Sequence, residues 1–433
     1  MAKKHIITAV LAIVIIAVYF ILIRAKLKAT MGTVPIELTI GIISILALLT
    51  SFLIMVVMII ITIGVLLFTR KKAGIKPWIL KIRRQLIITF TLLFMLGIVT
   101  VSSQHMTYTP PIVCKGGKVV SGSIAELRKV KLNGSNEWIT IRGKNKDKPI
   151  LLFLAGGPGG TLLSATRIQL KALEDNFVVV NWDQPGAGKS CNAVKVDFLT
   201  PKRYVSDAYE LTKYLCQRFN KKKIYVCGES WGSALGIMLV KQHPELFSAF
   251  VGTGQMISFT DTELYDYNTA IKMAKENGDS KVVEKLKKQS LPPYYGNGAV
   301  LKAWTYYSYL DECMQRNKNI WNSGYSTFSE MAGPEYGLYD KLNYILGMIK
   351  TYDRVYPQLY GIDFRKQDEK IDVPVYIFQG RHDINAPTEF VQEYYDKLKA
   401  PSKKLIWFEH SGHDTWRNEN KKFCNTMINV LLK

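Results

Sequence analysis

Three long apolar runs open the chain. Ile6–Ile23 and Leu38–Phe68 contain no charged residue, and Leu86–Val101 is a shorter third run that includes several threonines. About 18–20 apolar residues are enough for a helix to cross the hydrocarbon layer of a membrane. The pattern therefore predicts three transmembrane helices within residues 1–105, and hence contact with membrane lipid.

A cleaved signal peptide is the alternative for the first run, because Lys3 and Lys4 give it a basic start. The run ends in Phe20-Ile21-Leu22-Ile23-Arg24, which lacks the small-x-small pattern that signal peptidases cleave. An uncleaved anchor is the better interpretation.

The pattern changes after residues 106–117, which read as a linker because they contain Pro110-Pro111 and Gly116-Gly117. Short apolar stretches then alternate with stretches of helical periodicity over residues 118–254. This rhythm is typical of a mostly parallel sheet covered by helices on both faces. The expected strands are Ser123–Leu132 and Glu137–Arg142, paired as a hairpin around Asn133-Gly134, then Pro149–Leu154, Phe177–Trp182, Ile224–Cys227 and Ala249–Gly252; the expected helices are Val205–Phe219 and Trp231–His243.

Residues 255–369 interrupt this rhythm with a block that is mostly helical in pattern and rich in Tyr, Lys and Glu. Strands and helices resume in residues 370–433. A helical block between two strands of one sheet predicts a lid over the sheet edge where α/β folds bind ligands. The resumed elements are a strand at Val373–Gln379, a helix at Glu389–Leu398, a strand at Lys404–Phe408 and a final helix at Thr415–Leu432.

The distribution of basic residues predicts which side of the membrane each part occupies. The first 101 residues hold 12 Lys and Arg and one acid, about half of the net charge of +22. Short loops rich in Lys and Arg stay in the cytoplasm. The N-terminus and the second loop together carry nine basic residues, and the first loop carries three. With three spans, the remaining chain is extracellular. The nine are Lys3, Lys4, Arg70, Lys71, Lys72, Lys76, Lys81, Arg83 and Arg84, against Arg24, Lys26 and Lys28.

Several other classes of function are not indicated. No basic stripe with interleaved aromatic residues suggests nucleic-acid binding. The six cysteines show no C-x-x-C spacing, so neither a metal site nor a disulfide framework is predicted. The glycine-rich stretch Gly156–Gly160 lacks the Lys-Ser/Thr of a phosphate-binding loop, and no cofactor is expected.

One stretch carries a specific chemical signal. Between the strand Ile224–Cys227 and the helix that begins at Trp231 lies Gly228-Glu229-Ser230-Trp231-Gly232, a G-x-S-x-G sequence. A strand that turns directly into a helix places the serine in a sharp turn, where only glycines fit on either side. The hydroxyl is then exposed above the sheet at a helix N-terminus, as a nucleophile requires. A chance match to five residues is the alternative.

Two later strands end in the partners that such a serine needs. Val375–Gln379 is followed by Gly380-Arg381-His382-Asp383, and Leu405–Phe408 is followed by Glu409-His410-Ser411-Gly412-His413. A serine hydroxyl needs a histidine as base, and a carboxylate fixes the histidine tautomer. The chain order Ser230, Asp383, His413 is that of an α/β-hydrolase. His382 and His410 are interpreted as structural.

From about residue 115 onward the sequence resembles α/β-hydrolases of the proline iminopeptidase type. It departs from that family at Ala155, where the family has histidine, and at Pro185, where it has arginine. The three-helix anchor is also outside the family's usual plan. The matching motifs are Ala155-Gly156-Gly157-Pro158-Gly159, the D-Q-x-G-x-G-x-S stretch Asp183–Ser190, Gly228–Ser233, Gly380–Asp383 and Ser411–His413.

The resemblance implies a serine aminopeptidase. Ser230 is then the nucleophile, His413 the base, Asp383 its orienting acid, and the N–H groups of Trp231 and Gly157 the oxyanion hole. The resemblance also implies that lid carboxylates bind the substrate amine. The candidates are Asp261, Glu263, Asp266, Glu330 and Glu335, with Glu335 preferred.

Two other functions compete with the aminopeptidase. A serine esterase or lipase acting on small acyl esters uses the same triad. A non-enzymatic receptor is the other possibility, but a binder does not need all three triad residues. An epoxide hydrolase is disfavoured because it requires a carboxylate where this chain has Ser230.

Overall fold

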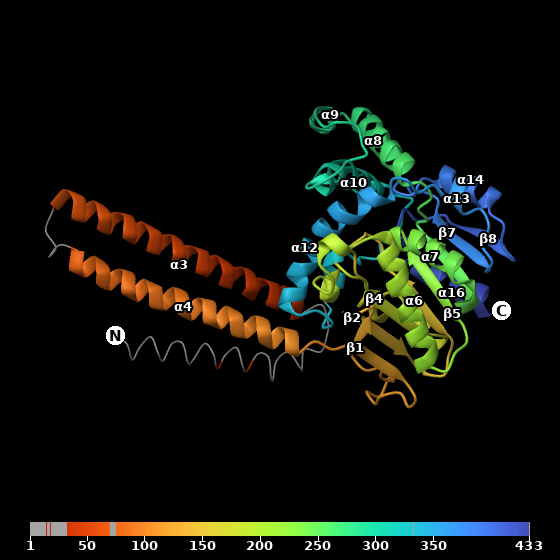
Figure 1. Cartoon of the computed structure of the whole chain (residues 1–433), viewed down its shortest axis with the longest axis horizontal. Helices are drawn as coiled ribbons and strands as arrows, with labels where there is room; N and C mark the ends of the chain where they lie inside the picture. The colour runs from red at the N-terminus through yellow and green to blue at the C-terminus, as the bar shows by residue number, and fades with distance from the viewer. Residues whose placement is uncertain (1–13, 15–17, 19–32, 70–74, 332, 433) are drawn as a thin grey trace. The chain divides into compact units, whose positions relative to one another are not determined.

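The computed structural model describes residues 14, 18, 33–69, 75–331 and 333–432 (Figure 1). The chain divides into two compact units. One consists of Met1–Thr107 with Ala332–Tyr339, and the other consists of Tyr108–Met331 with Asp340–Lys433. The first is called the helical unit; the second contains the segment whose sequence resembles α/β-hydrolases and is called the hydrolase unit.

Two long helices form most of the helical unit, α3 (Thr33–Thr69) and α4 (Lys76–His105). Among the described residues, Gly41–Phe68 and Lys76–His105 are the helices long and apolar enough to cross a membrane. The first predicted span, Ile6–Ile23, lies almost entirely outside the described residues. The helix that contains the last predicted span, α4, is longer than the apolar run Leu86–Val101 because it begins at Lys76. Lys76, Lys81, Arg83 and Arg84 therefore belong to a helix and not to the predicted loop.

Polar side chains join α3 to α4 between their apolar stretches. The Ser51 and Thr89 hydroxyls lie 2.8 Å apart, and Gln85 Nε2 donates to Ser51 Oγ at 2.6 Å. Hydrogen bonds of this kind between small polar side chains stabilise helix pairs in apolar surroundings.

In the described part of the chain, eight strands form one sheet in the order β1-β2-β4-β3-β5-β6-β7-β8. β1 pairs with β2 and β2 with β4 in antiparallel fashion, and the other neighbours are parallel. The mostly parallel sheet predicted from the sequence is confirmed. The strands are β1 (Ile124–Leu132), β2 (Ser135–Gly143), β3 (Ile150–Leu154), β4 (Val178–Asp183), β5 (Ile224–Glu229), β6 (Phe247–Thr253), β7 (Val375–Gly380) and β8 (Lys403–Phe408).

The hairpin between β1 and β2 turns where the sequence predicts. Asn133 and Gly134 both have positive φ, at 43° and 85°, and Leu132 pairs with Ser135 across the turn. A two-residue turn with positive φ at both positions matches the right-handed twist of the strands.

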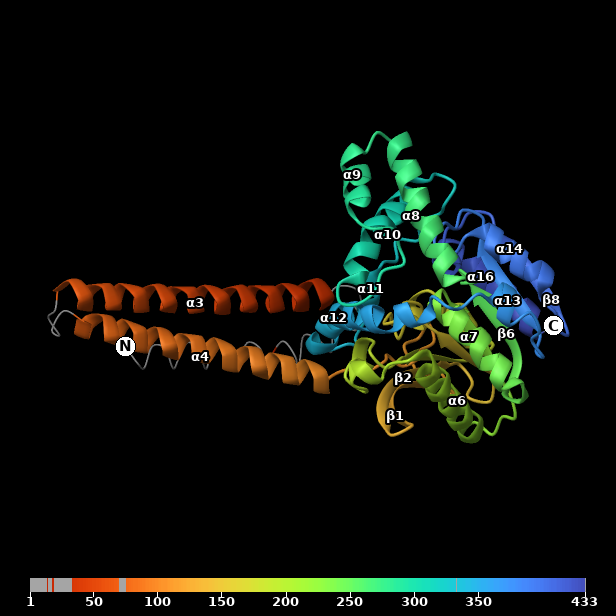
Figure 2. The ribbon, with the colours of Figure 1, turned by 45° about the horizontal axis from the view of Figure 1, so that its top comes forward.

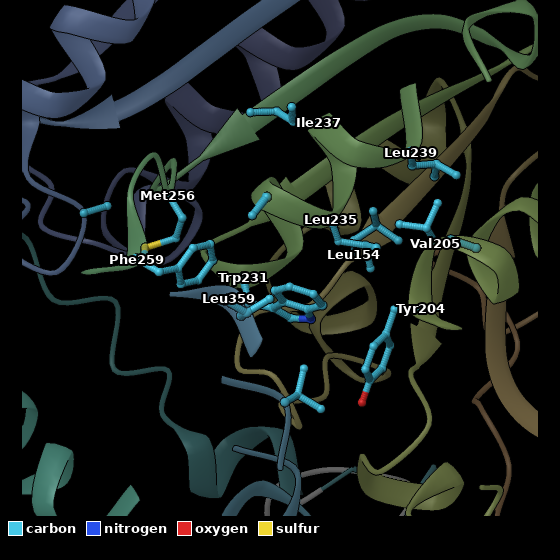
Figure 3. Packing of buried hydrophobic residues seen from close by; sticks show 14 of the residues in the cluster. Leu154, Tyr204, Val205, Trp231, Leu235, Ile237, Leu239, Met256, Phe259 and Leu359 are labelled. Atoms are coloured by element: carbon cyan, nitrogen blue, oxygen red, sulfur yellow. The ribbon is translucent and has the colours of Figure 1, made fainter. Parts of the chain in front are cut away.

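Two hydrophobic clusters cover the two faces of the sheet. One includes residues of α6 and α7, and the other includes Phe423 and Met427 of α16. Trp231 lies in the first cluster beside Tyr204, with ring centroids 5.6 Å apart (Figure 3). The helices outside the lid are α5 (Ala165–Ile168), α6 (Pro201–Arg218), α7 (Trp231–Gln242), α14 (Thr388–Lys397), α15 (Thr415–Asn418) and α16 (Asn420–Leu432), with 3-10 turns η3 (Lys171–Asp175), η4 (Gly188–Ser190), η5 (Val196–Phe198) and η6 (Pro244–Leu246). The 3-10 turn η7 (Tyr356–Leu359) lies within the lid.

The predicted final helix, Thr415–Leu432, is in fact two helices. α15 ends at Asn418 and α16 begins at Asn420. Glu419 lies between them, and its Oε2 accepts hydrogen bonds from His410 N and Ser411 Oγ. Glu419 thus leaves helical geometry to hold the loop that follows β8.

A helical block separates β6 from β7, as the sequence predicts for the lid. Figure 2 shows α8, α9 and α10 grouped together, and α8 contacts both of the others. The block contains α8 (Phe259–Glu276), α9 (Ser280–Lys288), α10 (Ala299–Arg316), α11 (Thr327–Met331), α12 (Leu338–Val355) and α13 (Phe364–Gln367).

Candidate active site

Ser230 occupies the turn between β5 and α7. Its φ is +52°, a conformation that a non-glycine residue adopts only when the surroundings enforce it. The backbone packs tightly on both sides of the serine. A Cβ on Gly228 would lie 2.1 Å from Gly232 O, and a Cβ on Gly232 would lie 2.2 Å from Leu154 O. The two glycines of G-x-S-x-G are therefore required by the close approach of β5, α7 and β3.

Asp383 and His413 come together at the ends of β7 and β8. His413 Nδ1 lies 3.0 Å and 3.1 Å from the two Asp383 carboxylate oxygens. Gln379 Nε2 and the Ala386 N–H donate to the same carboxylate, at 2.8 Å and 2.9 Å. The carboxylate is thus fixed from three sides, and it holds the imidazole in one orientation. Sequence reasoning missed Gln379, although a polar residue ending an apolar strand was a usable signal.

Burial alone lowers the pKa of His413, but its acidic neighbours outweigh that effect. The carboxylate of Asp383, with smaller contributions from Asp414 and Glu229, raises the pKa of His413 to about 10. These acidic neighbours therefore stabilise a positive charge on His413, as is needed when a histidine accepts a proton from a serine.

A cavity of about 300 Å³ brings the predicted residues together. Ser230, His413, Gly157 and Trp231 all line it, and Asp383 lies behind His413. Its other walls are mainly apolar, include several aromatic side chains and come mostly from the lid. They include Phe259, Trp304, Tyr307, Tyr352 and Tyr356.

The loop after β4 contacts residues around this cavity. Gln184 accepts a hydrogen bond from Trp231 Nε1 at 2.9 Å and donates to Ala155 O at 3.0 Å. Asp183 accepts from Lys189 N at 2.7 Å, and burial raises the pKa of Asp183 to about 8. Gln184 therefore links the serine turn to the glycine-rich loop, and Asp183 holds the start of its own loop.

The other histidines near the site make different contacts. His410 stacks on Trp321 with ring centroids 4.3 Å apart, and its Nδ1 lies 3.1 Å from Asn319 O. His382 donates its backbone N–H to Ser411 O. Glu229, which precedes the serine, accepts a hydrogen bond from Trp416 Nε1 at 2.7 Å. The choice of His413 among these histidines agrees with this geometry.

The lid carboxylates occupy different environments. Glu263 is buried and accepts hydrogen bonds from Tyr306 and Tyr307, and Tyr307 lines the cavity. Asp266 is buried, and neither of its oxygens has a hydrogen-bond partner among the described residues. Asp261 pairs with Arg365, and Glu330 accepts from Ser164 N at 2.7 Å.

The preferred candidate, Glu335, is buried but is not among the residues that line the cavity. It belongs to the segment Ala332–Tyr339 of the helical unit, so its role in substrate binding stays a prediction without structural support. The carboxylate that does line the cavity is Asp311 of α10. No sequence motif marks Asp311, and only the folded lid brings it to the cavity.

Gly254 offers a test of how closely His413 must be positioned. A Cβ there would lie 2.9 Å from His413 Cε1 and 3.0 Å from Nδ1. Since a misplacement of about 1 Å can cost about 100-fold in rate, Gly254→Ala is expected to lower kcat by 10- to 100-fold. The matched control is Gly278→Ala, which also has positive φ but has no atom within 4 Å of its Cβ position. Steady-state kinetics of both variants check this, and equal kcat values would contradict it.

Comparison with known proteins agrees with the architecture. Residues 149–415, more than half of the chain, match the family described as alpha/beta hydrolase fold. The chain belongs to the α/β-hydrolase fold family. The predicted fold class is confirmed for the hydrolase unit.

Its curated relatives carry aminopeptidase names. The chain is 28% identical over 311 residues to "Probable aminopeptidase YbaC" of Bacillus subtilis (strain 168), which covers 70% of this α/β-hydrolase and 96% of the relative. It is 24% identical over 303 residues to a proline iminopeptidase of Clostridium botulinum, covering 66% and 91%. These relatives support hydrolase activity.

Solved structures share the fold. The proline iminopeptidase of Mycobacterium smegmatis aligns with a TM-score of 0.51 at 17% identity, covering 70% of this α/β-hydrolase and 97% of that chain. VinJ aligns with the same TM-score at 20% identity and the same coverage. At these identities the likeness concerns the fold alone.

Proposed function

We propose that this α/β-hydrolase is a membrane-anchored serine aminopeptidase that releases an N-terminal residue, proline among the candidates, from peptides through an acyl-enzyme. The observation that carries the proposal is the arrangement around His413. Its Nδ1 is held by Asp383, while His413 and Ser230 line the same cavity. The names of the curated relatives support the choice of aminopeptidase within the fold family.

In the proposed reaction, Ser230 Oγ attacks the carbonyl carbon of the first peptide bond, and His413 accepts the hydroxyl proton. Asp383 stabilises the imidazolium that forms. The N–H groups of Trp231 and Gly157 donate to the developing oxyanion, and each such donor supplies about 3 kcal/mol of transition-state stabilisation. His413 then donates its proton to the leaving amine. Water, deprotonated by His413, hydrolyses the acyl-enzyme.

Recognition of the substrate amine is assigned in this proposal to Asp311. It is the acidic side chain among the residues that line the cavity. An ammonium group in the cavity is therefore favoured over a neutral group at that position.

The test compares substrates that differ only in the amine. Full-length protein in detergent is assayed on a panel of aminoacyl-naphthylamides, on their N-acetyl derivatives, and on p-nitrophenyl esters. We expect naphthylamide turnover, with acetylation lowering kcat/KM by roughly 100-fold or more because an amine–carboxylate contact is lost. Equal turnover of free and acetylated substrates would exclude an aminopeptidase.

The same panel tests the alternative function, a serine esterase acting on small acyl esters. The aromatic walls of the cavity favour an apolar acyl group, which is the observation in support of this alternative. Rapid ester hydrolysis without any naphthylamide turnover would establish the esterase in place of the aminopeptidase.

The proposed location is the cell membrane, with several spans and the hydrolase unit outside. The two apolar helices of the described chain and the basic residues near Lys3 and Arg70 support it. Protease added to intact spheroplasts should then digest residues 115–433. Full protection before lysis would place the hydrolase unit in the cytoplasm.

A further inference from the structure

A second cavity, of about 310 Å³, adjoins the first. His413 and Asp311 line both cavities. The remaining walls of the second cavity come from the end of α10, from residues 320–327 and from residues 412–418, and they are mostly polar. The two cavities thus meet at the histidine that would transfer the proton. They differ in chemistry, since the first is lined mainly by apolar side chains, several of them aromatic.

Arg417 of α15 is the basic side chain among the residues that line the second cavity. Its Nη1 lies 2.9 Å from Asp414 Oδ2, and its guanidinium group packs 4.9 Å from the Trp416 ring centroid and 5.8 Å from that of Tyr325. These contacts fix the plane of the group. Its Nε is buried and has no hydrogen-bond partner among the described residues. A buried donor without an acceptor is unfavourable, and a ligand oxygen would remove that penalty.

The charged groups of the two cavities lie within electrostatic reach of one another. Burial and Asp414 raise the pKa of Asp311, while the positive charges of Arg417 and His413 act in the opposite direction. A carboxylate that lines both cavities and a guanidinium group that lines the second one therefore lie near His413, which also lines both cavities. This polarity matches a small substrate with an ammonium group at one end and a carboxylate at the other.

We propose that the second cavity binds the residue that follows the scissile bond, and that Arg417 binds the free α-carboxylate of that residue. The preferred substrates are then dipeptides, with the amine at Asp311 and the carboxylate at Arg417. This inference rests on the proposed aminopeptidase function. The acyl part occupies the aromatic cavity, and the leaving amine must lie beside His413 to receive its proton.

The geometry of a dipeptide explains why a free carboxylate is expected. In a dipeptide, only one Cα separates the leaving nitrogen from the carboxylate, so that group must bind close to His413. The unpartnered Nε and the neighbouring Nη2 form the edge of a guanidinium group that pairs with both oxygens of a carboxylate. A longer peptide or a peptide amide presents a neutral amide there, which accepts fewer hydrogen bonds and carries no charge.

The experiment measures the ratio of kcat/KM for a dipeptide to kcat/KM for its amide. A substitution that lowers activity on both substrates equally leaves this ratio unchanged. Full-length protein in detergent is assayed on a dipeptide Xaa-Ala and on its amide, Xaa-Ala-NH₂, where Xaa is the residue best released from naphthylamides. Wild-type kcat/KM is expected to be at least about 10-fold higher for the free acid, the lower range for a charge-assisted pair. Arg417→Gln should bring this ratio close to one, and Arg417→Lys should give an intermediate ratio.

The matched control is Arg316→Gln, which removes an exposed positive charge at the end of α10 without lining either cavity. Its ratio should equal that of the wild type. A wild-type ratio of one, or a ratio unchanged by Arg417→Gln, would overturn the assignment of the second cavity even where naphthylamides are hydrolysed. Absence of turnover of every aminoacyl substrate would instead overturn the aminopeptidase function on which it rests. The wild-type ratio is decisive even if Arg417 variants do not fold.

Discussion

Replacing Ser230 with alanine is expected to abolish turnover of every substrate while the protein stays folded. The hydroxyl oxygen is the atom that would form the acyl-enzyme, and nothing else in the turn between β5 and α7 replaces it. Loss of a triad nucleophile lowers kcat by roughly 10⁴-fold or more in serine hydrolases. Steady-state kinetics and the thermal unfolding midpoint of the variant are the measurements.

Ser308→Ala is the matched control for that substitution. Ser308 lines the same cavity, but its hydroxyl donates to Trp304 O at 2.6 Å within α10. Its removal should change kcat less than about fivefold, as for a surface hydroxyl bonded to its own helix. Full activity in Ser230→Ala, or equal losses in both variants, would show that Ser230 is not the nucleophile.

Replacing His413 with alanine is the second substitution with a very large expected effect. Only a base beside Ser230 takes its proton, so kcat should fall by roughly 10⁴-fold or more. His410→Ala is the control, because His410 lies three residues away, is half-buried and stacks on Trp321. Its kcat should stay within about tenfold of wild type, since its contacts are structural.

The outcome for the two histidines separates the assignment from its nearest competitor. If His410→Ala were inactive and His413→Ala active, the base would lie on the other side of the loop that follows β8. The Asp383–His413 contact at 3.0 Å would then be a structural pair only.

The sequence can indicate where the proposed catalytic residues lie, because each of them follows the end of a strand. Ser230, Asp383 and His413 each follow an apolar strand, and parallel strands of one sheet end at one edge. The glycines at 228 and 232 mark the tight turn directly, since a Cβ at either would collide with backbone. Such constraints involve neighbours in sequence, and they are visible without the fold.

The lid is predicted less well because its side chains meet through long-range packing. Asp311 and Arg417 lie more than 100 residues apart, yet both line the second cavity. Nothing in their local sequence marks either one. The sequence around Glu335, Gly333-Pro334-Glu335-Tyr336, favours it as the residue that binds the substrate amine. This local sequence carries no information about the cavity. Helical pattern alone located the lid, but it could not orient its acidic residues.

The boundaries of helices also depend on contacts that the spacing of hydrophobic residues does not reveal. The final helix is interrupted at Glu419 because that carboxylate holds the loop containing His410 and Ser411. α4 begins at Lys76, ten residues before the apolar run Leu86–Val101 from which it is predicted. Basic residues such as Arg83 are good helix formers and extend the helix.

Covalent trapping tests the proposed serine aminopeptidase most directly. Full-length protein is incubated with an aminoacyl diphenyl phosphonate, digested, and the adduct is located by mass spectrometry. The adduct is expected on Ser230, and it should form much more slowly when the reagent's amine is acetylated. An adduct on another residue, or equal rates for the free and acetylated reagents, would contradict a serine aminopeptidase built on Ser230.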